Sequence, residues 1–253
     1  MLREEIYYII GNAYKEFSRM PNAISYDEVL RSVESESNHL KYVYLSLGQG
    51  LNIIEKEKLG QLENEGKLGF IINRHHRLAP KKLSHKTKVH NTMISEPLLI
   101  DKDKKYTAYL LLDDDCAEMS DHITGMHLQG MVLTEAARQV MLAVGEKFIL
   151  PDNLKGQSYF ALRRVNSIYH QFAFPLDMQI IHEIKSLKIR GKICIVETVT
   201  TFIQNEKKVT EVEIDYIASD KQDLINKEAL MAEIALQESA SKNLSESYVD
   251  RCA

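Results

Sequence analysis

The spacing of hydrophobic positions changes along the chain, and the changes mark predicted boundaries. In residues 2–17 apolar side chains recur every three or four positions, which is typical of a helix. Pro21 ends that helix, and Ser25 followed by Glu28 has the capping-box pattern of a second one. A third helical stretch is predicted for residues 40–65, so we expect residues 1–72 to form a helical N-terminal extension.

From residue 89 onward the hydrophobic period becomes two, which indicates strands. The predicted strands are residues 89–100, 106–112, 159–165, 178–189, 192–203 and 209–217. The most apolar helix, residues 131–147, lies between the second and third strands, and another helix is predicted at 223–240 before a frayed tail. Closely spaced strands favour antiparallel pairing, so the order predicts an α+β protein with a hotdog fold, an antiparallel sheet wrapped round a central helix. We assign residues 86–220 to this domain and residues 221–253 to a C-terminal helix and tail.

The two domains are joined by a basic segment. Residues 73–90 contain six lysines and arginines, four histidines and no acid, and Pro80 prevents a continuous helix. We interpret residues 73–85 as a linker. Its charge is consistent either with a solvated connector or with a dock for an acidic carrier protein or a phosphate. The histidines lack a metal-ligand spacing, so no metal site is predicted.

Composition excludes several classes of protein. The net charge of −4 argues against nucleic-acid binding, and no apolar run approaches the roughly 20 residues that cross a bilayer. The N-terminus has acids where a signal peptide needs a basic start. The three cysteines are far apart, which predicts neither a disulfide framework nor a zinc site. We therefore expect a reduced, cytoplasmic protein with no bound cofactor.

Candidate chemistry gathers in and before the apolar helix. Glu135 and Arg138 lie on one side of it, and an isolated buried carboxylate would be costly. One interpretation is an internal ion pair, or one at a subunit interface. The other is a catalytic site, in which Gly130 permits close backbone approach and His122 and His127 on the preceding loop move protons.

The segment GMHLQGMVLTEAARQ resembles the signature of the A-factor biosynthesis (AfsA-type) hotdog proteins. The matching positions are His127, Gly130, Met131, Leu133, Glu135, Ala136, Ala137, Arg138 and Gln139. The similarity extends more weakly to residues 88–90 and to Phe172 and Pro175, and covers roughly residues 86–219. A more distant resemblance links the chain to hydroxyacyl-carrier-protein dehydratases, although an ungapped match puts Asp121, not His122, at their catalytic histidine.

The resemblance implies acyl-thioester chemistry: transfer of a 3-oxoacyl chain from acyl carrier protein or CoA to a small hydroxyl acceptor in signal or secondary-metabolite synthesis. Glu135, helped by His127 and His122, would act as base. Gly130 and Met131 would contact substrate, and an arginine among Arg138, Arg163 and Arg164 would hold phosphate or stabilise charge. The phosphopantetheine arm of acyl carrier protein, or CoA, enters as substrate.

Two features depart from the family pattern. Its enzymes usually carry two hotdog repeats, whereas this chain shows one, and the N-terminal extension is additional. A single repeat leaves a sheet edge and a pocket incomplete, so we expect a homodimer. The alternatives are a dehydratase or thioesterase, or a non-catalytic acyl- or signal-binding protein whose extension serves as an interaction module.

Overall fold

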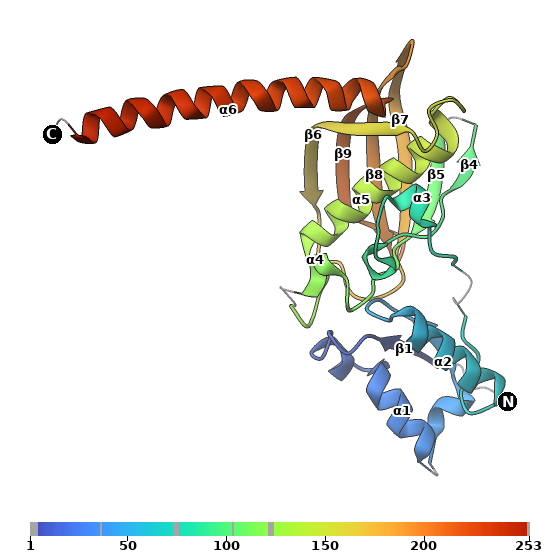
Figure 1. The fold of residues 1–253 in the computed structure, drawn as a ribbon. Coiled ribbons are helices and arrows are strands. Elements are labelled where there is room, and N and C mark those ends of the chain that lie inside the picture. The colour runs from blue at the N-terminus through green and yellow to red at the C-terminus, as the bar shows by residue number, and fades with distance from the viewer. Residues whose placement is uncertain (1–4, 36, 73–75, 103, 121–123, 252–253) are drawn as a thin grey trace.

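The computed structural model describes residues 5–35, 37–72, 76–102, 104–120 and 124–251. These residues form an N-terminal α/β lobe, a hotdog lobe and a long C-terminal helix (Figure 1).

The N-terminal lobe is built on a parallel sheet, so the prediction of a helical extension was wrong. Its strands are β1 (Ile6–Ile10), β2 (Ala23–Ser25) and β3 (Tyr44–Leu47), in the order β2-β1-β3. Both pairs that β1 makes are parallel. The β1 sequence IYYII is β-branched and aromatic and favours a strand, although its spacing also fits a helix. Pairing with distant segments decided between the two.

Helices connect and cover this small sheet. They are α1 (Tyr26–Glu34) and α2 (Ile53–Asn64), with the 3-10 turns η1 (Phe17–Arg19) and η2 (His39–Tyr42). The predicted cap of α1 is confirmed: the Ser25 side chain accepts from the Glu28 amide, and the Glu28 carboxylate accepts from the Ser25 amide at 2.9 Å. The capping box involves two residues that are three positions apart, so the sequence alone was enough to predict it.

The hotdog lobe is a six-stranded antiparallel sheet curled round one buried helix, as predicted. Its order is β4-β5-β7-β8-β9-β6. The strands are β4 (Leu98–Asp101), β5 (Lys105–Tyr109), β6 (Ser158–Tyr169), β7 (Gln179–Arg190), β8 (Ile193–Gln204) and β9 (Lys207–Asp220). The helix α5 (Gly130–Val144) crosses the concave face of the sheet (Figure 1). It ends in a π-helical turn, η4 (Gly145–Ile149). The core forms where α5 packs on alternate residues of the sheet.

Part of the predicted linker belongs to this lobe. The short helix α3 (Lys81–Ser84) packs on α5 with Leu83 and Ser84 buried, and the Ala79 amide donates to the Ile94 carbonyl at 2.9 Å. The long strand expected at 89–100 is also broken: a 3-10 turn, η3 (Val89–Asn91), precedes it, and β4 begins only after Pro97. Proline has no amide hydrogen to donate to a ladder, which explains the interruption.

The two lobes are joined through Gln49, which is buried just after β3. Its side-chain amide donates to the carbonyls of Leu110 and Leu176, both at 3.1 Å. Its carbonyl accepts from the Leu112 amide at 2.8 Å. One side chain therefore satisfies three backbone groups of the hotdog lobe and ties the two lobes together.

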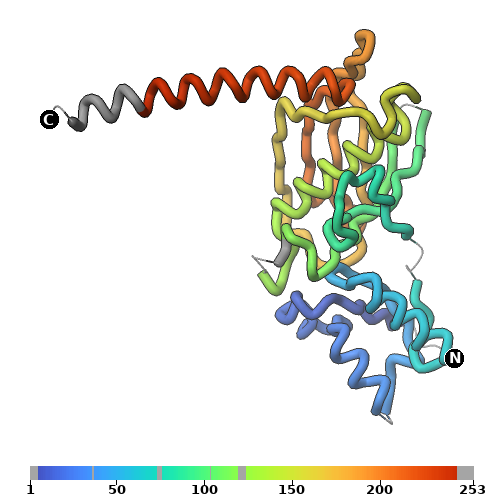
Figure 2. Tube along the Cα trace, viewed as in Figure 1, coloured from blue at the N-terminus to red at the C-terminus, as the bar shows by residue number. Residues whose placement is uncertain are grey.

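The last helix, α6 (Lys221–Arg251), projects away from the body on the side of β6 (Figure 2). Its bounds extend beyond residue 240, where the sequence predicted the end of the helix. Its apolar side chains Leu230, Met231, Ile234 and Leu236 are exposed. A short helix, α4 (Ala117–Ser120), precedes the loop that leads to α5. Across the described ranges no helix combines the length and the apolar character needed to span a bilayer.

Candidate active site on the central helix

Glu135 is the centre of a charge network on α5. Arg138 binds its carboxylate in bidentate fashion, with Nε 2.7 Å from Oε2 and Nη2 2.7 Å from Oε1. Lys86 Nζ lies 2.8 Å from Oε1. Burial acts to raise the pKa of Glu135, but hydrogen bonds from Arg138 and Lys86 outweigh it and hold the pKa below its ordinary value. The carboxylate is therefore ionised.

Lys86 ties this network to α4. Its Nζ lies 2.7 Å from Glu118 Oε1 as well as beside Glu135. Burial acts to lower the pKa of Lys86, yet the two carboxylates raise it above its ordinary value. Sequence reasoning placed neither Lys86 nor Glu118 at this site. The two residues precede Glu135 by 49 and 17 positions, and only folding brings them beside it.

Gln139, also on α5, bonds both to Glu135 and to the backbone of residues 91–93. Its side-chain amide donates to the Asn91 carbonyl at 2.9 Å and to Glu135 Oε1 at 3.2 Å. Its carbonyl accepts from the Met93 amide at 2.9 Å. The last glutamine of the EAARQ segment thus fixes residues 91–93 against α5 and orients the carboxylate. It belonged to the quoted motif, but its role was not predicted.

A cavity of about 250 Å³ lies beside the carboxylate. It is lined by Glu118, Met131, Thr134, Glu135, Arg138, Leu162, Val165 and Ile214. Three of the predicted residues, Glu135, Arg138 and Met131, therefore meet at one place. Apart from Thr134 and the charge network, the lining is apolar, and one of its side chains, Met131, is 70% exposed.

The first residue of α5, Gly130, must be glycine for a steric reason. A Cβ at this position would lie 2.7 Å from two ring carbons of Tyr169, so only glycine lets that ring pack on the start of α5. The Tyr169 hydroxyl is 2.9 Å from Thr134 Oγ1, which is itself 2.9 Å from Ser167 Oγ. Gly130 therefore serves the contact between helix and strand.

The remaining predicted residues lie elsewhere. The ring of His127 packs against Phe172, with centroids 5.0 Å apart, and Thr124 binds its backbone carbonyl. His122 falls outside the described residues. Arg164 bonds Asp215 at 2.9 Å on the sheet face opposite α5, and the neighbouring Arg163 is exposed at a bulge of β6. None of the three described residues lines the cavity beside Glu135.

A larger cavity of about 780 Å³ continues along α5. Arg138 and Leu162 line both cavities. Its floor holds Glu146, a buried carboxylate of the π-helical turn. Glu146 accepts from Gly156 N and Ser158 Oγ, both at 2.9 Å, and lies 3.1 Å from His85 Nε2. Burial acts to raise the pKa of Glu146, and the bonds from His85, Gly156 and Ser158 lower it overall.

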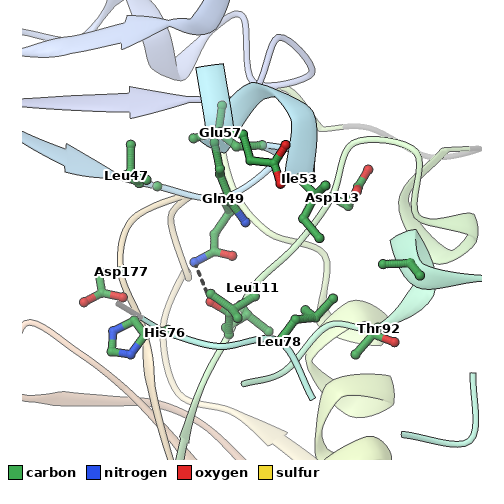
Figure 3. A pocket seen from close by; sticks show the side chains of 15 residues that line it. Leu47, Gln49, Ile53, Glu57, His76, Leu78, Thr92, Leu111, Asp113 and Asp177 are labelled. Carbon is green, nitrogen blue, oxygen red and sulfur yellow. Dashed lines mark hydrogen bonds between the residues drawn. The ribbon is translucent and has the colours of Figure 1, made fainter. Parts of the chain in front are cut away.

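A third cavity, of about 320 Å³, lies between the lobes (Figure 3). Leucines and Gln49 form much of its lining, Asp177 and His76 lie together at one side, and Asp113 lies near Ile53. Burial lowers the pKa of Lys56 in its wall and raises that of Asp177. This cavity is therefore also lined by charged groups, but none of its lining residues belongs to α5.

Within the part of the chain that the structure describes, no group of three or more His, Cys, Asp or Glu side chains is arranged to hold a metal ion. Cys116 and Cys194 are buried, and neither forms a disulfide.

The curled antiparallel sheet with a single enclosed helix defines a hotdog protein. The sequence pattern of the A-factor biosynthesis hotdog domain (AfsA) matches residues 71–218, which is more than half of the chain. The chain therefore belongs to this family, and the resemblance carried by residues 125–139 is confirmed. No curated protein matches the chain in sequence.

Solved structures with related folds are distant. A putative thioesterase from Ralstonia eutropha, described as phenylacetic acid degradation-related, is 14% identical, with 48% of this chain and 82% of that one covered at a TM-score of 0.37. A Haemophilus influenzae thioesterase is 10% identical, covering 51% and 79% at 0.37. A mutant thioesterase from Pseudomonas aeruginosa is 14% identical, covering 57% and 98% at 0.39.

Proposed function

We propose that this protein processes acyl thioesters, as an acyltransferase that moves a 3-oxoacyl chain from acyl carrier protein or CoA to a small hydroxyl acceptor. Membership of the A-factor biosynthesis family supports the reaction class. The observation that carries the proposal is the ionised Glu135, oriented by Arg138, Lys86 and Gln139 at the wall of an apolar cavity. A carboxylate beside cations at the wall of an apolar cavity suits acyl transfer.

In this reaction the acceptor hydroxyl attacks the thioester carbonyl carbon, and the carbon–sulfur bond breaks. Glu135 receives the hydroxyl proton, which then passes to the leaving thiolate, so the products are an ester and a thiol. Arg138 and Lys86 stabilise the negative charge that develops on the carbonyl oxygen. The lowered pKa of Glu135 makes it a weak base, so much of the catalysis comes from holding the hydroxyl in place.

We further propose that the active form is a homodimer joined at the β6 edge. Strand β6 pairs only with β9 among the described strands, so its other side is an open sheet edge. Apolar side chains are exposed there and at the start of α5, namely Met131, Leu162, Val165, Ile168, Tyr169 and Phe172. A second copy would bury them and close the cavity beside Glu135.

The test is to incubate the purified protein with 3-oxoacyl thioesters, with and without a small hydroxyl acceptor such as dihydroxyacetone phosphate, and to identify products by mass spectrometry. We expect an ester from the wild type and its loss in Glu135→Gln, with the fold retained by circular dichroism. Glu213→Gln, on the opposite sheet face, is the matched control and should react normally. Undiminished ester formation by Glu135→Gln would reject the assignment.

One observation favours a second candidate, a non-catalytic acyl-binding protein. Both oxygens of Glu135 already accept hydrogen bonds, which is how a purely structural ion pair looks. Tight thioester binding without any product would support this candidate. Free acid in place of ester would indicate a thioesterase, and an enoyl thioester from a 3-hydroxyacyl substrate would indicate a dehydratase.

A further inference from the structure

The cavity between the lobes shares no lining residue with the two cavities along α5. Its lining includes Leu47, the last residue of β3, and several residues of the segment 48–57 that follows. Parallel sheets bind ligands beyond the carboxyl ends of their strands, and pockets between lobes are frequent binding sites. The volume of about 320 Å³ falls at the low end of the range for small-molecule sites. The place and the size of the cavity therefore suit a small ligand.

Apolar side chains supply much of the lining of this cavity. Leucines contribute from both lobes, namely Leu47, Leu51, Leu78, Leu110 and Leu111. The uncharged polar side chains in the lining are already bonded within the protein. Gln49 binds three backbone groups of the hotdog lobe, and Thr92 Oγ1 lies 3.1 Å from Ser84 Oγ. A ligand that fits this surface has an apolar body.

The charged part of the lining is predominantly acidic. Within the described ranges Glu57, Asp113 and Asp177 contribute carboxylates, and Lys56 is the one lysine or arginine. Each aspartate uses Oδ1 to accept a neighbouring backbone amide, at 2.9 Å for Asp113 and 3.1 Å for Asp177. Neither aspartate forms an ion pair with a described residue, and the second oxygen of each has no hydrogen-bond donor among those residues. The cavity therefore has acceptors for a cationic donor.

Asp177 is the carboxylate at which a bound cation would gain most. It lies beside His76 at one side of the cavity (Figure 3), and the His76 ring is stacked on Tyr109 with centroids 3.6 Å apart. Burial raises the pKa of Asp177 by more than the charge of His76 lowers it, so the histidine does not compensate for the loss of water. Asp113 differs, because its charge already acts on Lys56 and raises the pKa of that lysine against the effect of burial.

We propose that this cavity binds a small amphipathic amine, with its ammonium group on Asp177 and its apolar body among the leucines. An ammonium carries three donors and a full charge, so it would form a charge-assisted bond to the free carboxylate oxygen. Because both lobes line the cavity, a bound amine would stabilise the contact between them. The inference is independent of the acyl-thioester function, since the cavity beside Glu135 has a separate set of lining residues.

The test compares octylamine, octanol and octanoate, which share one alkyl chain and differ in the end group, by isothermal titration calorimetry with the full-length protein. We expect the amine to bind about tenfold more tightly than the alcohol, as a hydrogen bond to a charged group provides, and the acid to bind most weakly. Asp177→Asn retains an oxygen for the Met178 amide but loses the charge, so the preference for the amine should vanish while octanol binding is unchanged. Asp152→Asn, whose side chain is 94% exposed outside the cavity, is the matched control and should keep the preference.

Hydrogen exchange locates the bound amine in the wild-type protein. The amides of Gln49 and Gly50 donate to the carbonyls of Pro175 and Leu112 in the other lobe, so octylamine should increase their protection. Equal affinity for the amine and the alcohol, a preference that persists in Asp177→Asn, or protection gained only along α5 would overturn the proposal. Tightest binding of octanoate would also overturn it and would make Lys56 the anchor, and so would the absence of binding by all three ligands.

Discussion

Two carboxylates of the hotdog lobe, Glu135 and Asp114, are both partly buried, but their pKa values are shifted in opposite directions. Glu135 is bound by Arg138, Lys86 and Gln139, and its pKa is lowered. Asp114 receives one amide bond, from Ala13 at 3.2 Å, and its other oxygen is buried without a hydrogen-bond partner among the described residues. The difference shows that donors, rather than burial, decide whether a withdrawn acid stays charged.

The pKa of Asp114 is raised from 3.8 to about 7 by burial, reinforced by repulsion from Glu55, Asp113 and Asp115 and opposed by the Ala13 amide. Asp114 lies against Gly11 at the junction of the lobes. Glu135 assembles a site within one lobe, whereas the raised pKa of Asp114 leads us to expect that the contact between the lobes depends on pH.

The largest effect is expected from removing Glu135. Glu135→Ala leaves Arg138 and Lys86 without their shared partner, which should lower the free energy of unfolding at pH 7 by roughly 3 kcal/mol. Urea denaturation measures it. The loss should shrink at acidic pH, because the ion network stabilises the fold fully above pH 4.5 and fades as pH falls through the lowered pKa. A change below 0.5 kcal/mol, the usual range for exposed sites, would show that the network is not buried in solution.

A smaller loss of stability is expected from a larger side chain at Gly11, where the two lobes meet beside Asp114. A Cβ at Gly11 would lie 2.5 Å from Asp114 Oδ1 and still closer to the Gly50 carbonyl oxygen, which belongs to the backbone and cannot rotate away. Gly11→Ala should therefore cost about 2 kcal/mol through overpacking. Hydrogen exchange should show lost protection at Gly50 and Leu112, whose backbone groups bond across the lobes.

Gly60→Ala, on α2 with no atom within 4 Å of the added Cβ, is the control for that substitution and should not destabilise. Protection at the junction that equals wild type in Gly11→Ala would contradict the packing described.

Asp114→Asn should moderately raise the free energy of unfolding at pH 8, whereas the two substitutions above lower it. The folded pKa of about 7 exceeds the ordinary 3.8, so the folded state binds the extra proton and the wild type loses stability as pH rises from about 4 to 7. The neutral amide removes this loss, so the variant should match wild type near pH 4 and exceed it at pH 8. Thermal unfolding across that range measures the difference. A variant less stable than wild type at pH 8 would refute the protonation assigned to Asp114.

The smallest effect is expected for Arg164→Ala. Its guanidinium bonds Asp215 and Glu213 on the outer sheet face, where both solvent and salt weaken ion pairs. Stability and acyl transfer should both be unchanged in denaturation and product assays. Loss of transfer would restore Arg164 to the role that the sequence first suggested for it.

The hotdog sheet was predictable because its signals are local. Strands β7, β8 and β9 alternate in burial, and the turns between them contain residues with positive φ, Gly191 at 58° and Asn205 at 50°. The pattern of β1 fits both a helix and a strand, and only its parallel partners β2 and β3 resolve it. Parallel pairing joins segments distant in sequence, so local periodicity does not report it.

The sequence alone determined the family, the central helix and the pairing of Glu135 with Arg138, because neighbours three residues apart on a helix share a side. Only the tertiary structure brought Lys86 and Glu118 to that pair and moved His127 away from it. The physical reason is distance along the chain: a helix sets the geometry of its own turns, while contacts between remote segments depend on how the whole core packs.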